Sequence, residues 1–321
     1  MNSRALALTG PTTSGKTALG LALARRLDAE IISMDSRQVY RAMDIGTDKV
    51  TAEERRGIPH FGLDLVDPDQ SYSAGRFARD VRRWVDEIEL RGHVPLLVGG
   101  TGFFLRAVLE PVFQEPALDP ARRAALRGWL DARPLDELAG MVERLDPARA
   151  SLAIEGGRQR LSRTLEVALL TGRPLSWWHR EAPPDGPAIP CLVVCLELPR
   201  EELDRRIDVR VSHMVERGLL EEVRALLDAG YGPDDPGMTG TGYREIVAVL
   251  RGEMALPDAL DEMRRQTRRY ARRQGTWFRN QLPSDTLRLD AREDRETLLD
   301  RIVAVWNDAV ARPRTKLREH P

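Results

Sequence analysis

The sequence predicts an α/β fold, in which a parallel sheet is flanked by helices, together with an all-helical insertion domain. Three observations predict it. Short apolar runs alternate with helical segments over residues 1–111 and 188–321. The first run leads through a glycine-rich loop, GPTTSGKT, directly into a helix, as in P-loop NTPase-like proteins. Over residues 112–187 apolar residues recur at helical spacing without a strand pattern. We therefore expect an α/β core from the two outer segments and a helical domain at residues 112–187.

The glycine-rich loop is predicted to hold phosphates. It lies between an apolar run at residues 5–8 and a predicted helix at residues 18–24. Glycines allow backbone N–H groups to turn toward phosphate oxygens, the helix N-terminus adds positive potential, and Lys16 adds a full charge. Thr17 offers its hydroxyl to a Mg2+ ion. The expected diphosphate- or nucleotide-binding residues are Gly10, Pro11, Thr12, Thr13, Ser14, Gly15, Lys16 and Thr17.

Polar residues follow two further predicted strands. Residues 30–35 form a strand that ends in Asp35, and residues 95–98 form one that runs into the Gly-Gly-Thr-Gly turn at 99–102. Ligands of doubly wound sheets bind beyond the carboxyl ends of the strands, so we expect Asp35 to face the phosphate loop. Thr101 is suited to touch a phosphate or a transferred proton. A helix cap for Asp35, and close helix packing for the glycines, are the alternative interpretations.

The other expected elements are less sharply defined. Residues 62–66 are a weak strand candidate, and Ser73 is expected to cap a helix that ends at Leu90. Further elements are expected as a strand at 191–198, one long helix over 200–229, a glycine-rich entry at 238–242 to a short helix, a helix at 257–280, an edge strand at 286–290, a closing helix at 293–308 and a loose tail at 312–321. Cys191 and Cys195 are four residues apart on a predicted strand, too far for a disulfide, so we expect buried thiols and no metal site.

Arginines form a stripe along the predicted helix at 257–280. Two lines at four-residue spacing make up this stripe: Arg264, Arg268 and Arg272, and Arg265, Arg269 and Arg273. No acidic residue interrupts residues 264–279. A solvated face is the plain interpretation in a chain whose 49 basic residues are mostly arginine, but the missing acids favour a contact with nucleic acid.

Composition limits the classes of protein. With 321 residues, of which 42% are hydrophobic and 31% charged, the chain is expected to be globular with about two domains. The net charge of −1 restricts any nucleic-acid surface to a local patch. No apolar run is long enough to cross a bilayer, and the residues before the loop are too few for a signal peptide. We expect a cytoplasmic monomer without membrane contact.

Seven separated motifs resemble, in the expected order, the tRNA dimethylallyltransferase family, also called tRNA isopentenyltransferases. These are GPTTSGKT at 10–17, DSRQVY at 35–40, MDIGTDK at 43–49, LVGGTG at 97–102, QRLSR at 159–163, GYRE at 242–245 and RRQGTWFRN at 272–280. The chain departs from the common pattern at Phe104, where the family often has Tyr, and at Phe61, where it often has His. His60 is expected to be structural.

The resemblance implies transfer of a dimethylallyl group from dimethylallyl diphosphate to the exocyclic N6 amine of the adenosine that follows the anticodon in tRNA. By resemblance, Asp35 is the general base, Thr101 bridges the leaving group and the reacting centre, and Arg123 lies beside the reactive channel. Lys16 and Thr17 are expected to bind diphosphate and Mg2+. The target base has to leave the stack of the anticodon stem-loop to reach these groups.

The resemblance also implies a set of tRNA-contacting residues. They are Asp35, Ser36, Arg37, Gln38, Thr101, Arg123, Gln159, Arg160, Leu161, Ser162, Arg163, Thr239, Gly240, Thr241, Gly242, Tyr243, Arg244, Arg272, Arg273, Gln274, Gly275, Thr276, Trp277, Phe278 and Arg279. Three other functions are compatible with parts of the sequence. A small-molecule or nucleotide kinase leaves the arginine stripe unexplained, a transferase acting on free adenine nucleotides does not need the insertion, and a non-enzymatic RNA-binding protein has no use for Asp35 beside a phosphate loop.

Overall fold

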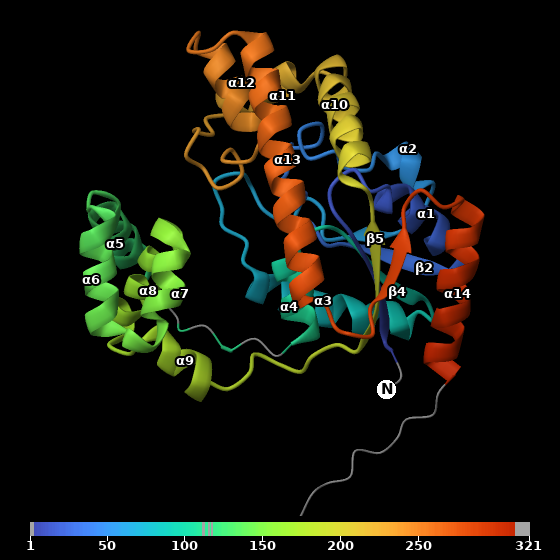
Figure 1. Ribbon diagram of the computed structural model, residues 1–321, viewed down its shortest axis with the longest axis horizontal. Coiled ribbons are helices and arrows are strands. Elements are labelled where there is room, and N and C mark those ends of the chain that lie inside the picture. Colours follow the sequence, from blue (N-terminus) through green and yellow to red (C-terminus); the bar gives the residue numbers. More distant parts are fainter. Residues whose placement is uncertain (1–2, 111–112, 115, 117, 312–321) are drawn as a thin grey trace, which may run out of the picture. The chain divides into compact units, whose positions relative to one another are not determined.

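A six-stranded parallel sheet forms the centre of the computed structural model, which describes residues 3–110, 113, 114, 116 and 118–311 (Figure 1). The strand order is β3-β2-β4-β1-β5-β6. The strands are β1 (Ala5–Thr9), β2 (Ala29–Ser33), β3 (His60–Phe61), β4 (Val94–Val98), β5 (Cys191–Glu197) and β6 (Leu287–Asp290). All neighbouring strands pair in parallel, which confirms the predicted fold class. Because β1 is central, its loop opens in the middle of the carboxyl edge.

Helices cover both faces of the sheet. Alternate side chains of β1 point to opposite faces, so Leu6 and Leu8 pack with α1 (Lys16–Leu27) and α14 (Arg295–Ala311), which contact each other. Ala5 and Ala7 belong to the second core cluster, with buried residues of α3 (Ala74–Leu90) and α4 (Gly102–Leu109). Both faces of β1 are thus dry, as expected for a parallel sheet.

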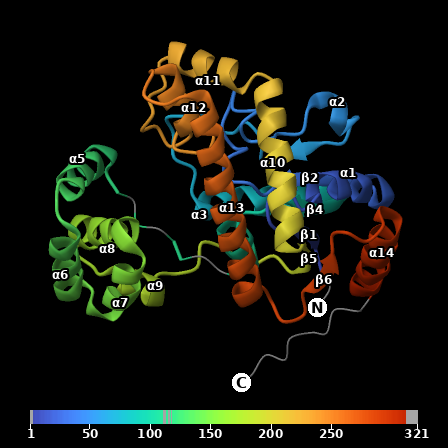
Figure 2. The ribbon, with the colours of Figure 1, turned by 45° about the horizontal axis from the view of Figure 1, so that its top comes forward.

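Two long helices cross the carboxyl edge of the sheet. They are α10 (Arg200–Glu216) and α13 (Leu256–Gln281), which contact each other and lie side by side in Figures 1 and 2. Between them in the chain come α11 (Leu219–Asp228) and α12 (Tyr243–Leu250), and the short helix α2 (Ala52–Arg55) follows β2. The position of α10 and α13 brings residues from distant parts of the sequence to the phosphate loop.

Two expected elements differ in the structure. The weak strand at 62–66 is wrong, since β3 ends at Phe61 and Gly62 turns the chain with a φ of 80°. The single helix over 200–229 is also wrong, because Gly218 adopts a φ of 96° and separates α10 from α11. The predicted cap is confirmed, since the side chain of Ser73 accepts the N–H of Arg76 at 3.2 Å. The expected loose tail at 312–321 lies outside the described residues.

The chain divides into two compact units, Met1–Glu110 with Ala188–Pro321 and Pro111–Pro187. In its described part the second unit contains α5 (Pro120–Asp131), α6 (Leu135–Leu145), a 3-10 turn at Pro147–Arg149, α7 (Ala150–Glu155), α8 (Gly157–Thr171) and α9 (Leu175–Glu181). It has its own hydrophobic core around Leu130, Leu138, Val142 and Leu165. A separate core allows a unit to fold around its own helices.

Candidate functional site

The loop between β1 and α1 turns at two glycines. Gly10 has a φ of 151°, and a Cβ atom there would lie 2.8 Å from the carbonyl oxygen of Leu196. Gly15 has a φ of 86° immediately before α1 begins. A side chain at either position would be strained, so the loop needs glycine at both.

Lys16 begins α1 and reaches back over this loop, where its Nζ donates to the Pro11 carbonyl oxygen at 3.0 Å. Burial lowers the pKa of Lys16 to about 8, while Asp35 opposes the shift and Arg210 adds to it. An anion in the loop would stabilise the charged ammonium. Lys16 is therefore suited to hold a phosphate group.

Three hydroxyl groups of the loop fit a phosphorylated ligand. Thr13 Oγ1 and Ser14 Oγ are buried and have no hydrogen-bond partner among the described residues. Since buried polar groups normally have partners, they mark a place that a ligand completes. Thr17 is exposed at the start of α1. These oxygens fit a diphosphate and also Mg2+, which takes few protein oxygens and keeps phosphate and water ligands.

The proposed base and its neighbouring hydroxyl follow two adjacent strands. Asp35 follows β2, is half-buried, and accepts the N–H of Arg37 through Oδ1 at 2.8 Å. Thr101 follows β4, and its Oγ1 accepts the N–H of Ser36 at 3.0 Å. Because the charge of Asp35 also acts on Lys16, the structure brings carboxylate, hydroxyl and ammonium together at the carboxyl edge of the sheet.

Tyr270 of α13 joins this group, although the sequence indicated only that it packs inward. Its hydroxyl lies near Thr101, and 37% of the residue is exposed. Burial and the charge of Asp35 raise the pKa of Tyr270 to about 12, so the phenol keeps its proton at neutral pH. The only feature of the sequence that indicated a place for Tyr270 in the site is its position four residues, about one helical turn, before the QGTWF segment.

Gln274 ties α13 to both glycine-rich turns. Its Oε1 accepts the N–H of Thr12 at 2.9 Å, and its Nε2 donates to the carbonyl oxygen of Gly100 at 2.8 Å. Only 6% of the residue is exposed. A Cβ atom on Gly100 would lie 2.5 Å from Nε2, so the glycine makes room for the amide. The amide of Gln274 is thus used within the chain, and the expected tRNA contact of this residue stays a prediction.

One side of α13 faces the turn at residues 99–102. Tyr270, Gln274 and Trp277 share this side. A Cβ atom on Gly102 would lie only 2.5 Å from the indole ring of Trp277, so the glycine makes room for the ring. The ring of Phe103 lies 6.4 Å from that of Trp277. Trp277 is half-buried and keeps an aromatic surface at the edge of the site.

Two arginines of α10 reach the phosphate loop and were missed by the sequence reasoning. Nη1 of Arg210 donates to Thr12 Oγ1 at 2.9 Å, and Nη1 of Arg206 lies 3.4 Å from the Thr13 carbonyl oxygen. Arg210 also lies 3.6 Å from Asp48 of the MDIGTDK motif. Their spacing of four residues on the helix after β5 was the available signal.

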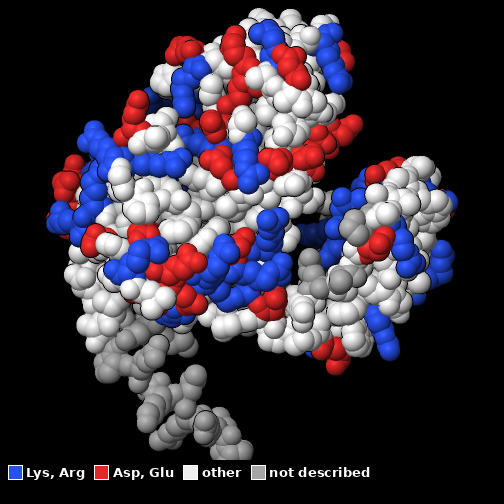
Figure 3. Space-filling view, turned by 180° about the vertical axis from the view of Figure 1, so that it is seen from behind, with Lys and Arg blue, Asp and Glu red and all other residues white. Residues whose placement is uncertain are grey.

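The arginine stripe is basic over only part of its length. Arg268 pairs with Asp208 of α10. Arg264 and Arg265 pair with acids one turn before them on α13, at 2.7 Å and 2.5 Å. Ion pairs within the chain therefore neutralise the first half of the expected basic stripe. Within the described part of the chain, Arg269, Arg272 and Arg273 carry no ion pair, and all three are exposed. On the face seen from behind in Figure 3, basic and acidic residues are interspersed.

The segment before α12 contains both exposed and buried members of the expected tRNA contact. Thr239, Thr241 and Arg244 are exposed and line a cavity of about 440 Å³. Tyr243 is instead 1% exposed, and its hydroxyl donates to Glu222 of α11 at 2.7 Å. The side chain of Tyr243 is therefore used within the chain, and its expected contact with tRNA stays a prediction. Gly240 and Gly242 are also buried.

The carboxylate of Glu222 also holds the backbone of the MDIGTDK motif. Oxygens of Glu222 accept three consecutive backbone N–H groups of that motif, from residues 44 to 46, at 2.6–3.0 Å. Tyr243 packs against Gly46, where a Cβ atom would lie 2.6 Å from the ring. Two motifs of the sequence thus form one clamp that supports the loop after Asp35.

The side chains of Arg37 and Gln38 in the DSRQ segment make hydrogen bonds with other residues of the chain. Nη1 of Arg37 donates to the Pro236 carbonyl oxygen at 2.9 Å, which links this segment to the loop before α12. Gln38 accepts the hydroxyl of Ser33 at 2.8 Å. Ser36 remains half-buried beside Thr101.

The helical unit contains the other expected residues. Nε of Arg123 pairs with Glu166 at 3.0 Å, and Glu166, which is 1% exposed, also pairs with Arg127. Along α8, Gln159 and Arg160 are exposed and Ser162 and Arg163 are half-buried. Leu161 and, in the other unit, Phe278 are each 2% exposed. The side chains of these two residues are buried, and their expected contact with tRNA stays a prediction. Gly275, Thr276 and Arg279 are accessible.

The motifs at residues 38–281 match the family profile "IPP transferase", and residues 3–65 match "Isopentenyl transferase". The chain belongs to the IPP transferase family. It is 43% identical to the tRNA dimethylallyltransferase of Heliobacterium modesticaldum over 94% of this chain and 95% of that one. It is 45% identical to the tRNA dimethylallyltransferase of Thermomicrobium roseum, over 87% and 85% of the two chains. The resemblance inferred from the motifs is confirmed.

Solved IPP transferases have the same fold. The full-length tRNA isopentenylpyrophosphate transferase of Bacillus halodurans superposes with a TM-score of 0.70 at 34% identity, covering 97% of each chain. A eukaryotic dimethylallyltransferase, whose crystal structures follow its action on tRNA, superposes with a TM-score of 0.79 at 27% identity, over 99% of this chain and 82% of that one. These similarities extend over both units of the present chain.

Proposed function

We propose that this chain is a tRNA dimethylallyltransferase, which transfers a dimethylallyl group from dimethylallyl diphosphate to the N6 amine of the adenosine following the anticodon and releases diphosphate. One observation carries the proposal: Asp35 and Thr101 follow adjacent strands, and the charge of Asp35 acts on Lys16 of the phosphate loop. A kinase would place its acceptor beside the loop but has no need for an RNA-binding helix over it. Membership of the IPP transferase family favours the transferase.

The diphosphate half of the reaction depends on the phosphate loop. As the bond to the allylic carbon breaks, negative charge grows on the leaving oxygen, and preorganised positive groups stabilise it. Lys16 and Arg210 supply two charges, and the free hydroxyls of Thr13 and Ser14 supply donors. We assign a Mg2+ ion to the hydroxyl of Thr17, where its charge would neutralise the departing diphosphate.

The amine half depends on Asp35. The lone pair of an adenine amine is delocalised into the ring, so a positioned proton acceptor assists its attack. Asp35 is half-buried and is oriented by the N–H of Arg37. Thr101 follows the adjacent strand, and its hydroxyl oxygen accepts the N–H of Ser36, the residue next to this carboxylate. These contacts hold the base at one position without consuming both of its oxygens.

The acceptor is proposed to be the anticodon stem-loop of tRNA, with the target base flipped toward Asp35. Exposed Arg269, Arg272 and Arg273 provide salt-sensitive contacts with phosphates, and Trp277 offers a surface for stacking. In the helical unit, Arg123 is proposed to lie beside the reactive channel, and exposed Gln159 and Arg160 to contact the RNA. Within the described residues no helix is long and apolar enough to span a membrane. We propose a cytoplasmic monomer.

One incubation tests the function. The protein is mixed with labelled dimethylallyl diphosphate, ATP, AMP and unmodified tRNA. We expect label on the tRNA together with release of pyrophosphate. Label on AMP would instead indicate a transferase of free nucleotides, and ATP turnover without labelled RNA would indicate a kinase.

The base assignment has its own test. Asp35→Asn is expected to bind tRNA normally and to lose about 100- to 10,000-fold in turnover, the usual contribution of a general base. Asp69→Asn is the matched control, because Asp69 is exposed and lies away from the strand ends. Equal turnover of the two variants would reject Asp35 as the base.

A further inference from the structure

A second cavity adjoins the phosphate loop on the opposite side of α13 from Thr101. It has a volume of about 520 Å³ and lies between the end of β5, the first turns of α10 and the second half of α13. Pro11 of the phosphate loop forms part of its wall. Arg268, Gly275 and Arg279 line it, and they lie on the side of α13 opposite to Tyr270, Gln274 and Trp277. Arg272 and Arg279, which also line it, are among the expected tRNA-contacting residues, but the proposed reaction gives the apolar residues of this cavity no role.

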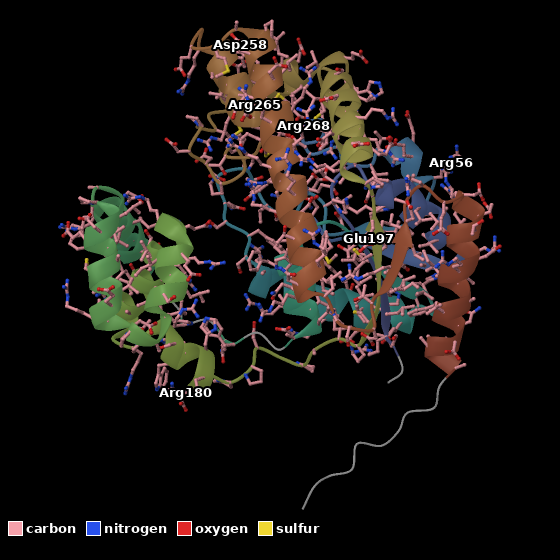
Figure 4. The ribbon with its side chains drawn as sticks, viewed as in Figure 1. Arg56, Arg180, Glu197, Asp258, Arg265 and Arg268 are labelled. Carbon is pink, nitrogen blue, oxygen red and sulfur yellow. The ribbon has the colours of Figure 1, made fainter. Side chains whose placement is uncertain are left out.

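The cavity has an apolar floor and a basic rim. Leu198, Leu203 and Ala271 are among the apolar residues that line it. Five arginines stand against the two carboxylates of Glu197 and Asp204, so positive charge is in excess. The arginines are Arg200, Arg268, Arg272, Arg279 and Arg288. Figure 4 labels Glu197 at the end of β5 and Arg268 on α13.

Some of these arginines are already neutralised. Arg288 pairs with Glu197 at 2.7 Å and donates to the Phe278 carbonyl oxygen at 3.0 Å, and Arg268 pairs with Asp208. Arg272 and Arg279 have no acidic partner in the part of the chain that the structure describes, and both are exposed. Two unpaired guanidinium groups above an apolar floor form a surface complementary to an organic phosphate.

The position and contents of the cavity narrow the class of ligand. It opens beyond the carboxyl end of β5, where sheets of this class bind ligands, and its volume is within the range of small-molecule sites. Guanidinium planes stack on bases as well as bind phosphates. The carboxylates of Glu197 and Asp204 would repel a ligand that is anionic throughout, but they accept N–H groups from a base that carries an amine.

We propose that this cavity binds one nucleotide, with its phosphate between Arg272 and Arg279 and its base on the apolar floor. The nucleotide has two possible sources, a free mononucleotide or one unit of an RNA strand along α13. Both present the same chemistry to the cavity. The proposal goes beyond the transfer reaction and its test measures binding alone, so a failure of the transferase assay would leave it standing.

Calorimetric titration with AMP and with hexa-adenylate RNA tests the site. The titrations use the Lys16→Ala protein, which lacks the ammonium of the phosphate loop, and the part of the remaining binding that the cavity contributes is read from the variants below. Adding Leu203→Trp fills the cavity, because Leu203 lines it and is half-buried. Adding Val209→Trp is the control, since Val209 lies on the same helix, is 45% exposed and does not line the cavity.

We expect Leu203→Trp to weaken binding at least tenfold and Val209→Trp to leave it unchanged. A loss seen with AMP identifies a free nucleotide as the occupant, and a loss seen only with hexa-adenylate identifies the RNA strand. The double variant Arg272→Ala with Arg279→Ala leaves the floor intact and is expected to give the same loss, whereas Arg265→Ala, outside the cavity, is not.

Three results would overturn the proposal. The first is equal affinity of the Leu203→Trp and Val209→Trp proteins for both ligands. The second is inorganic phosphate that binds as tightly as AMP, since the base would then contribute nothing. The third is binding of geranyl diphosphate without binding of either nucleotide ligand, which would identify a prenyl site.

Discussion

Replacement of Gln274 by Leu tests whether α13 positions both substrate-binding turns. Leu removes both amide contacts and leaves the N–H of Thr12 and the carbonyl of Gly100 without partners in a buried place. An unpaired buried polar group costs about 1–3 kcal/mol, so the two together predict a loss of about 2–6 kcal/mol. Because both groups belong to turns that hold the reacting parts, we expect the loss to lower transfer as well as stability.

Urea unfolding and steady-state kinetics measure the two effects. Gln266→Leu is the matched control, because Gln266 is a half-buried glutamine of the same helix whose amide binds only Glu262, one turn away. We expect Gln274→Leu to raise the KM for dimethylallyl diphosphate and lower kcat, while tRNA affinity changes little. If Gln274→Leu unfolds at the same urea concentration as Gln266→Leu and keeps its KM, then Gln274 does not position the two substrate-binding turns.

Four further predictions concern charged side chains of the site and of α13. Raising the pH through about 8 should weaken pyrophosphate binding by up to about tenfold per unit, because the free protein loses the Lys16 proton that the bound anion requires; in Lys16→Arg the dependence should flatten. In the same range the lowered pKa of Lys16 makes the folded protein bind fewer protons than the unfolded chain, so this residue's contribution to stability should rise with pH rather than fall. Arg210→Ala should weaken pyrophosphate binding about 10- to 100-fold, the usual effect of losing a charged hydrogen bond, whereas Arg205→Ala on the same helix, where the arginine pairs with Glu202, should not. Arg272→Ala with Arg273→Ala should reduce the slope of log K for tRNA against log salt by about one per lost phosphate contact, and the ion-paired Arg264→Ala with Arg265→Ala should reduce it less; equal slopes would show that pairing within the chain does not matter.

Local patterns predicted the parts of the fold that depend on neighbouring residues. The phosphate loop, the cap at Ser73 and the edge strand at 286–290 each depend on residues a few positions apart, and each is present in the structure. The break between α10 and α11 also depends on one residue, Gly218. The sequence did not reveal it, because the charged residues on both sides continue the pattern of one helix and only the structure shows the positive φ of this glycine.

Contacts between distant residues explain what the sequence could not predict. Arg268 and Asp208 are 60 positions apart, and Gln274 and Thr12 are 262 apart. A stripe of arginines without interleaved acids is therefore not evidence of free charge, since the acids come from another helix, as for Arg268, or from the preceding turn, as for Arg264 and Arg265. In the same way, the GYRE motif reads as an RNA contact until Glu222 is seen to bind both Tyr243 and the backbone after Asp35.

The two sides of α13 connect the chemistry of the site with its surroundings. Gln274 fixes this helix against the phosphate loop and the turn at Gly100. Arg272 lies two residues before Gln274 but on the opposite side of the helix, where it lines the second cavity. Because a buried amide bridge is rigid, a ligand that displaces α13 from the cavity side would also move the N–H of Thr12. Occupancy of the cavity should therefore change the affinity of the loop for pyrophosphate, and by linkage pyrophosphate should change the affinity of the cavity by the same factor.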